Sequence, residues 1–337
     1  MDPVDALNET AFWLERRQAV SYKVDAFRNA ARAIEPMGAK AIAEGVRTKR
    51  LQGVKGIGKR TFEVISEAVG GEVPGYLAEL RDQNQGPLVS GGAALRKRLR
   101  GDLHSHSNWS DGGSSIEEMA KAAHWRGRDY LALTDHSPNL TIANGLSPDR
   151  LKKQMEVVAE VNDSYDDFRL LSGIEVDILE SGRLDQEKPL LDLLDVVVAS
   201  VHSKLTMSAP VMTRRLVTAI SNPQMNVLGH CTGRLVAGGR GKRPESTFDA
   251  EIVFAACERF DVAVEINSRP ERLDPPDRLL EIAIDMNCLF SINTDAHAPG
   301  QLDFLDYGAE IAERNGIDPD RIVTTWPLDR LLEWATA

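Results

Sequence analysis

Short apolar runs alternate with longer amphipathic stretches over residues 101–297, and this alternation dominates the pattern of the chain. The runs have the length and composition of buried strands, and they occupy residues 102–106, 130–136, 170–175, 196–202, 227–230, 262–267 and 289–297. Between most of them apolar residues recur at helical spacing, in residues 114–127, 147–165, 210–222, 246–260 and 276–287. The connection 176–195 is less regular. Strand–helix alternation of this kind predicts an α/β fold with a parallel sheet.

Polar side chains that can bind a metal fall at or just after the ends of these runs. They include six of the seven histidines and three carboxylates: His104, His106, Asp111, His136, Glu175, His202, His230, Asp295 and His297. Residues two apart on a strand point to one side, so the first two histidines can face one point. Functional groups at the C-terminal ends of successive strands are typical of a barrel whose active site lies on that face.

This set predicts a polynuclear metal site. Mixed imidazole and carboxylate ligands suit zinc, manganese or iron. For any one histidine taken alone, a hydrogen-bonded core residue is the better interpretation. The seventh, His124, lies inside a helix-like segment and is interpreted as an ordinary, partly buried histidine.

The first part of the chain is patterned as helices, with apolar residues at helical spacing in residues 2–20, 23–34 and 39–47. A Gly-Ile-Gly turn then opens another helix among cations. Glycine lets the backbone approach a ligand closely, and a helix N-terminus offers N–H groups to an anion. This predicts non-sequence-specific binding to the phosphate backbone of DNA, and the alternative is a tight turn without a ligand. The candidate DNA contacts are Lys23, Lys55, Gly56, Gly58, Lys59 and Arg60.

Composition is that of an ordinary globular protein, with 42% hydrophobic and 27% charged residues in a chain of 337. No apolar run reaches the roughly 18 residues of a membrane span, and the acidic, polar N-terminus is unlike a signal peptide. The three cysteines (Cys231, Cys257 and Cys288) are scattered and predict no disulfide framework. We therefore expect a cytoplasmic protein without a membrane partner. The oligomeric state stays open, with a monomer favoured.

Charge differs between the two parts of the chain. Residues 1–100 carry 17 Lys and Arg against 12 Asp and Glu, a net charge of +5, whereas the whole chain carries −11. This asymmetry suggests two domains with different partners, although chance variation would also produce it. Residues 83–100 are rich in Gly, Pro and polar residues and end in a basic cluster. They predict a linker between an all-α domain at 1–82 and a barrel domain at 101–337.

Seven short motifs resemble those of the polymerase-and-histidinol-phosphatase (PHP) family of metal-dependent phosphoesterases. They are Asp-Leu-His104-Ser-His106, Ser-Asp111-Gly, Thr-Asp-His136-Ser, Gly-Ile-Glu175, Ser-Val-His202-Ser, Leu-Gly-His230 and Asn-Thr-Asp295-Ala-His297. The resemblance implies a distorted (βα)7 barrel with a trinuclear centre. The variant that is most similar is the PHP domain of bacterial X-family DNA polymerases, and residues 1–82 resemble the N-terminal helix-hairpin-helix domain of those enzymes. The chain leaves no room for a polymerase palm, and it has Cys231 where proline is common in the family.

The resemblance also implies a distribution of ligands over three divalent metals. One metal is assigned His104, His106, Glu175 and Asp295; a second is assigned Glu175, His202 and His230; a third is assigned Asp111, His136 and His297. In this assignment Glu175 bridges two ions.

From these features we expect metal-dependent phosphodiester hydrolysis on DNA, as a 3′–5′ exonuclease, an abasic-site endonuclease or both. The candidate catalytic residues are Glu175, Asp295, His202, Arg234 and Arg272, with Lys204 and Arg269 as weaker candidates for phosphate contacts. One alternative is a small-molecule phosphomonoesterase of the histidinol-phosphatase type. Another is a non-catalytic DNA-binding adaptor, which the nine competent ligand positions argue against.

A further expectation concerns an absence. Some X-family polymerases carry a lysine in the N-terminal domain that forms a Schiff base and removes a 5′-deoxyribose phosphate. By motif register this lysine falls eight residues after Gly56, and the position is Val64 here. Valine has no amine, so the sequence predicts no lyase chemistry in this domain.

Overall fold

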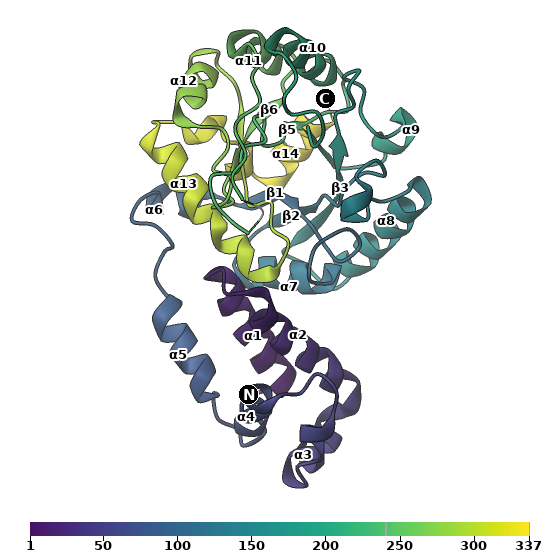
Figure 1. Cartoon of the computed structure of the whole chain (residues 1–337), viewed down its shortest axis with the longest axis vertical. Helices are drawn as coiled ribbons and strands as arrows, with labels where there is room; N and C mark the ends of the chain where they lie inside the picture. Colours follow the sequence, from purple (N-terminus) through teal and green to yellow (C-terminus); the bar gives the residue numbers. More distant parts are fainter. Residues whose placement is uncertain (240, 337) are drawn as a thin grey trace. The chain divides into compact units, whose positions relative to one another are not determined.

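The computed structural model describes residues 1–239 and 241–336. The chain divides into two compact units (Figure 1), one formed by residues 1–87 with 299–301 and the other by residues 88–298 and the chain from residue 302 onward. We describe each unit by itself.

The first unit is helical. Its helices are α1 (Pro3–Arg16), α2 (Ser21–Ile34), α3 (Gly38–Arg47), α4 (Lys59–Val69) and α5 (Gly75–Asn84), with short 3₁₀ turns at Glu35–Met37 and Arg50–Gly53. Helix α1 begins where it does because the Asp2 carboxylate accepts the N–H groups of Val4 and Asp5 and Pro3 follows the cap. The apolar faces of α1, α2 and α4 form the core of this unit, with Leu7, Ile34 and Ile65 fully buried.

The second unit is built on seven parallel strands in sequential order: β1 (Gly101–Ser105), β2 (Tyr130–Leu133), β3 (Arg169–Asp177), β4 (Val196–Ser200), β5 (Val227–Leu228), β6 (Ala263–Asn267) and β7 (Phe290–Asn293). A parallel bridge between Ser105 and Ala296 joins the first strand to the segment after the last, and the His106 N–H donates to the Ala296 carbonyl at 2.7 Å. The sheet is therefore a nearly closed barrel, and the predicted (βα)7 fold is confirmed.

Helices surround the strands (Figure 1): α6 (Ala93–Arg98), α7 (Ile116–Trp125), α8 (Pro148–Asn162), α9 (Lys188–Leu191), α10 (Ala209–Ile220), α11 (Ala250–Arg259), α12 (Asp277–Asp285), α13 (Leu305–Arg314) and α14 (Leu328–Ala335). Short 3₁₀ turns lie at Thr141–Ala143, Pro299–Phe304, Pro319–Arg321 and Val323–Thr325. The strands are buried on both faces, which explains why they are apolar runs instead of alternating ones.

The segment expected as a linker is partly folded. Leu95 and Leu99 lie one helical turn apart and are both buried, which holds α6 against the barrel unit. The Arg96 guanidinium donates to the Asp306 carboxylate at 2.9 Å, and Arg98 and Arg100 form ion pairs with Asp320 and Asp129. Three cations of the basic cluster thus have carboxylate partners within the barrel unit.

Among residues 1–239 and 241–336, no helix has both the length and the apolar character that crossing a bilayer requires.

Candidate metal centre

The carboxyl ends of the strands bring all nine predicted ligand residues together. His104 lies in β1 and Glu175 in β3, and the others follow the ends of β1, β2, β4, β5 and β7. Most are buried, and only the Asp111 side chain, 36% exposed, has substantial access to solvent. Residues distant in sequence converge because parallel strands in one barrel all end at the same face.

The Glu175 carboxylate lies at the middle of this cluster. Imidazole nitrogens from five histidines lie around its two oxygens: His136 at 2.9 Å, His230 at 3.0 Å, His104 and His202 at 3.3 Å and His106 at 3.6 Å. Two ligand atoms that share one ion at a bond length of about 2.1 Å lie about 3.0–3.4 Å apart. The observed separations therefore match those of atoms that bind common ions.

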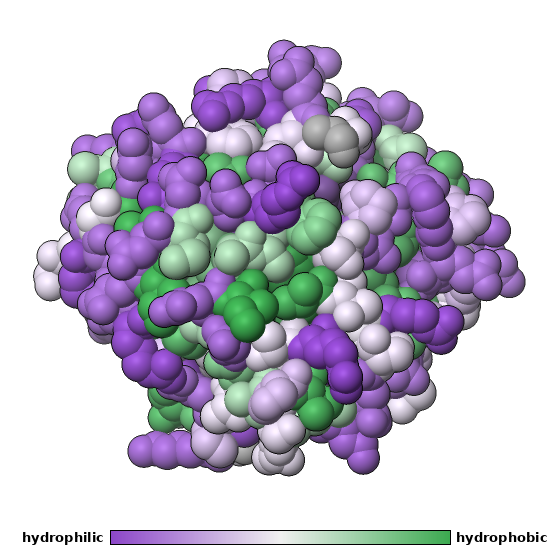
Figure 2. Space-filling model, turned by 90° about the horizontal axis from the view of Figure 1, so that it is seen from above, coloured by the Kyte–Doolittle hydropathy of each residue, from purple (hydrophilic) through white to green (hydrophobic). Residues whose placement is uncertain are grey.

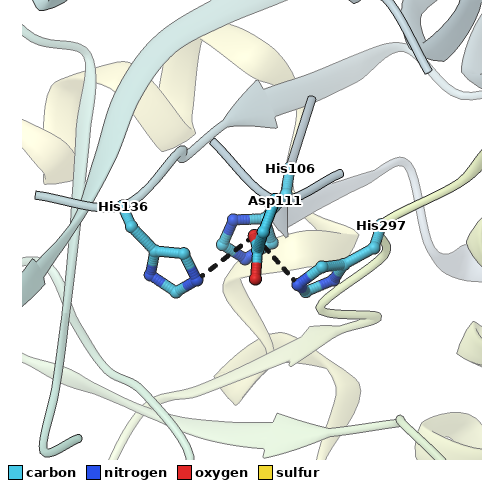
Figure 3. A group of neighbouring side chains, drawn as sticks. All are labelled: His106, Asp111, His136 and His297. Atoms are coloured by element: carbon cyan, nitrogen blue, oxygen red, sulfur yellow. Dashed lines mark ion pairs between the residues drawn. The ribbon is translucent and has the colours of Figure 1, made fainter. Parts of the chain in front are cut away.

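A second group lies around Asp111 (Figure 3). Its Oδ1 atom is 3.5 Å from His136 Nε2 and 3.4 Å from His297 Nε2, and one atom each from His106, Asp111, His136 and His297 lies within 4.8 Å of the others. The group overlaps the Glu175 cluster, since His106 and His136 also approach Glu175. The two groups therefore form one continuous cluster of residues that could bind metal ions.

Polar atoms without hydrogen bonds show that these residues fit metal ions. Within the described parts of the chain, both Glu175 oxygens and ring nitrogens of His104, His106, His136 and His230 are buried without a hydrogen-bond partner. Leaving such groups unsatisfied costs free energy. Divalent cations would satisfy these atoms together, and carboxylate oxygens and imidazole nitrogens are suitable donors for them.

Two acidic residues that the sequence analysis did not select orient the histidines. The Nδ1 atom of His104 lies 2.7 Å from Glu265 Oε1, and that of His202 lies 2.6 Å from Asp177 Oδ1. A carboxylate at Nδ1 fixes the proton there and leaves the Nε2 lone pair for a metal. For Asp177 the spacing along the strand could have given the signal, because it lies two residues after Glu175 on the same side of β3.

Electrostatics keep the carboxylates ionised. Burial alone would raise the pKa of Glu175, but the surrounding histidines outweigh it and hold this pKa well below its usual range. The pKa of Asp295 is likewise lowered well below its usual range, because His106, His104 and two arginines offset its burial. Both groups therefore carry negative charge for a cation.

The histidines fall into two classes. Burial lowers the pKa of His106 to about 3 and that of His230 to about 4, so both rings stay neutral, as metal binding requires. Burial also acts on His104 and His202, but their carboxylate neighbours prevail. The pKa of His104 rises well above its usual value and that of His202 rises to about 9. Binding of an ion at these two rings therefore releases protons.

The candidate phosphate-binding cations differ in their surroundings. Arg272 is 5% exposed and donates from Nε to Asp295 Oδ2 at 3.0 Å, while its Nη1 is buried without a hydrogen-bond partner in the described chain. Arg269 donates from Nη1 to the Asp295 carbonyl at 2.8 Å. Arg234 donates to the carbonyls of Arg272 and Leu273, and Lys204 is exposed. Of the four, Arg272 has the clearest unused donor at the centre.

The predicted hairpin in the helical unit presents its polar residues to solvent. Lys55, Gly56, Gly58, Lys59 and Arg60 are all exposed, as is Lys23 on α2. Ile57 between the glycines is 7% exposed and anchors the turn in the core. Gly56 has φ +94°, a conformation that favours glycine. Ile57 thus fixes the turn to the core of the helical unit, while the cations of the turn and the N-terminus of α4 remain exposed to solvent.

A parallel barrel with a histidine–carboxylate cluster at its carboxyl face is an arrangement that metal-dependent hydrolases use. Residues 102–268 match the family described as the PHP domain, and residues 1–71 match the helix-hairpin-helix domain. The barrel therefore contains a PHP domain, the domain type of metal-dependent phosphoesterases, and the N-terminal unit contains a helix-hairpin-helix domain.

Curated relatives fall into two groups. The chain is 37% identical over 226 residues to the DNA polymerase/3′-5′ exonuclease PolX of Bacillus subtilis, a match covering 67% of this chain and 39% of that relative. It is 26% identical over 235 residues to a probable phosphatase of Thermoanaerobacter sp., covering 66% of this chain and 89% of that one. The chain thus spans about two fifths of the first relative and most of the second.

A solved structure is also similar. The histidinol phosphate phosphatase of Lactococcus lactis, complexed with zinc, L-histidinol and phosphate, matches with a TM-score of 0.46 and 16% identity, covering 65% of this chain and 95% of that one.

Proposed function

We propose that the protein hydrolyses phosphodiester bonds in DNA at a three-metal centre, as a 3′–5′ exonuclease, an abasic-site endonuclease or both. The observation that carries this proposal is the combination in one chain of a phosphoesterase centre with a helix-hairpin-helix turn that exposes three cations. A small substrate needs no such domain. The 37% identical relative, named as a DNA polymerase and 3′-5′ exonuclease, adds support.

The ligands divide among three sites in the proposal. His104, His106, Glu175 and Asp295 hold one ion, and the 3.4 Å between His106 Nε2 and Asp295 Oδ1 supports that grouping. Glu175, His202 and His230 hold a second, consistent with the two histidines facing Glu175 Oε1. Asp111, His136 and His297 hold the third. Zinc, manganese and iron all suit this donor set.

Divalent ions in such a centre supply Lewis acidity at phosphate oxygens and lower the pKa of a bound water toward neutrality. The chain contributes the rest. Glu265 and Asp177 hold the rings of His104 and His202 in the metal-binding tautomer. Arg272 holds the Asp295 carboxylate through Nε and offers its buried Nη1 to a non-bridging phosphate oxygen. Asp111, being partly exposed, lies on the side of the centre open to substrate.

The helix-hairpin-helix turn positions the substrate. Backbone N–H groups at the N-terminus of α4 and the side chains of Lys55, Lys59 and Arg60 contact the phosphate backbone without reading sequence. In this proposal the helical unit provides the affinity for DNA, and the barrel hydrolyses the phosphodiester bond.

A single comparison tests the proposal. Purified protein supplied with Mn²⁺ or Zn²⁺ is given end-labelled DNA with and without an abasic site, and histidinol phosphate in parallel, with Glu175→Ala as the inactive control. Shortening from the 3′ end, or incision at the abasic site, supports the proposal. Turnover of histidinol phosphate without any DNA cleavage contradicts it.

The second candidate function is a small-molecule phosphomonoesterase. It is favoured by the relatives named as probable phosphatases, one of which this chain covers over 89% of its length. Every proposed metal ligand serves that chemistry equally well. The two candidates differ in the role of the helix-hairpin-helix domain, whose cations are dispensable for a small substrate.

A further inference from the structure

A buried carboxylate, Asp135, holds the loop that carries Asp111. Asp135 is 1% exposed and follows β2 immediately before His136. Its Oδ1 accepts the Ser107 N–H at 2.8 Å and the Ser110 hydroxyl at 2.5 Å. Its Oδ2 accepts the Ser107 hydroxyl at 2.5 Å and the Gln154 amide at 2.6 Å. Three of these four hydrogen bonds come from the segment that leads directly into Asp111.

The Asp111 loop is a tight turn folded around Ser107. The N–H groups of Ser110 and Gly112 donate to the Ser107 carbonyl, at 3.2 and 2.9 Å. A side chain at Gly112 would approach the Ser107 main chain to 2.7 Å, so the turn closes only with glycine there. Fixing Ser107 and Ser110 therefore fixes Asp111.

The contacts of the Asp111 side chain fix its position only weakly. Its carboxylate is partly exposed, and its contacts are long: 3.5 Å to His136, 3.4 Å to His297 and 3.4 Å to the Ser110 hydroxyl. Asp135, in contrast, is buried and accepts four hydrogen bonds through its two oxygens. Because Asp135 and His136 are neighbours in sequence, the Asp135 hydrogen bonds set the position of Asp111 against that of His136.

We propose that Asp135 is the positioning residue of the third metal site, the one formed by Asp111, His136 and His297, and that it has little influence on the ions held by Glu175. The inference rests on the proposed three-metal centre. The loop has other supports, since Gly113 N–H donates to the His297 carbonyl at 2.7 Å and Asn144 donates to the Trp109 carbonyl at 3.0 Å. Removal of Asp135 therefore loosens Asp111 and leaves the loop folded.

The test measures binding of Mn²⁺ alone to the full chain, by equilibrium dialysis and elemental analysis over a range of free Mn²⁺. Asp135→Ala is expected to weaken one of three sites about 10- to 100-fold, the usual effect of losing a group that supports a metal ligand. The other two sites keep their affinity. Asp111→Ala is expected to weaken the same site, and the double variant is expected to be no worse than Asp111→Ala.

A matched control comes from the opposite end of the strands. Asp195 accepts both the N–H and the hydroxyl of Ser172 at 2.8 Å, the same pair of bonds that Asp135 receives from Ser107. Asp195→Ala should leave all three Mn²⁺ affinities unchanged. Ser110→Ala, a milder change, should weaken the third site about 10-fold and keeps the proposal testable if Asp135→Ala does not fold.

The possible outcomes distinguish a failure of the role assigned to Asp135 from a failure of the proposed metal centre. Wild-type protein with three sites, together with Asp135→Ala and Ser110→Ala variants of unchanged affinity, overturns the role of Asp135 alone. Equal weakening of all three sites, or an added loss in the double variant, overturns it too, since a merely structural role produces that result. Wild-type protein that takes up no Mn²⁺ overturns both the proposed metal centre and the inference.

Discussion

The ligand cluster in the barrel and the hairpin in the helical unit differ in how they expose their polar side chains to solvent. The centre gathers nine side chains from six strand ends, buries most of them and orients their rings with further carboxylates. The hairpin uses a few neighbouring residues, leaves Lys55, Lys59 and Arg60 exposed and buries Ile57 as an anchor. Chemistry on phosphate needs fixed, desolvated charges, whereas contact with a phosphate backbone needs accessible charges that tolerate many substrates. The following predictions separate the two regions.

The largest effect should come from Glu175→Ala. This change removes both oxygens from a position within 3.6 Å of five imidazole nitrogens. We expect loss of more than one bound metal and a fall in kcat/KM of at least about 10³-fold on DNA and on a small phosphodiester alike, above the cost of a single electrostatic donor. Elemental analysis and initial rates measure this. Glu180→Ala, an exposed neighbour with the same charge change, is the control, and full metal content in Glu175→Ala would contradict the bridging role.

Metal removal should affect the barrel and spare the hairpin. An ion that binds only the folded centre slows local opening by the factor 1 + [metal]/Kd, about 100-fold at 100 times Kd. Hydrogen exchange of the segments after β1, β2 and β7 should therefore slow on adding Mn²⁺ and recover on adding EDTA. Exchange in α4 should stay the same. Equal responses in both regions would contradict their separation.

Charge reversal in the hairpin should affect DNA and nothing else. Lys59→Glu with Arg60→Glu removes two exposed cations, and we expect weaker DNA binding with a salt dependence reduced by about one unit of slope per lost phosphate contact. Arg60 also lies over the Tyr76 ring at 5.1 Å, so helix content should be checked by circular dichroism.

The control for this pair is Lys152→Glu with Lys153→Glu. These lysines are also adjacent and exposed, and they lie on α8 of the barrel unit. The change in net charge is the same, so any difference between the two variants reflects position. Hydrolysis of a small chromogenic phosphodiester should be unaffected by either pair. If the hairpin variant loses that activity as well while staying folded, the division between affinity and chemistry is wrong.

The same contrast explains what the sequence could predict. The seven strands and their parallel sheet followed from the apolar runs, because a strand buried on both faces leaves a continuous signal. The barrel followed from the polar groups at the strand ends, and its (βα)7 form from the resemblance to the PHP family. Candidate ligands such as His104 and His202 stood out because histidine is rare here and fell at run ends. Glu265, Asp177 and Asp135 were missed because acidic residues are common, and the three-dimensional contacts are what distinguish a carboxylate that supports a ligand residue or its loop from one on the surface.

Outside the site, contacts between residues far apart in the sequence also limit what the sequence alone can predict. The helix α6 was not expected because three of its six residues are basic and because the ion pair that holds it, from Arg96 to Asp306, joins residues 210 positions apart. Burial of Leu95 in the core of the barrel unit also stabilises it. Arg234 was selected as a phosphate contact from its place after a strand. Its guanidinium instead donates to main-chain carbonyls at 272 and 273, so that assignment stays a prediction with little geometric support.

The smallest expected effect is a null result in the helical unit. Schiff-base chemistry needs an amine. The position expected for that amine is occupied by Val64, which is 1% exposed and lies on the buried face of α4. Lys59 begins the same helix and is exposed, but residues five apart do not share a helix face closely. With a 5′-incised abasic duplex and borohydride in EDTA, we therefore expect no covalent adduct on residues 1–82. The same duplex trapped with a lysine-dependent lyase is the positive control. An adduct that maps to Lys59 or Lys55 would give the hairpin a chemistry of its own and end its contrast with the barrel.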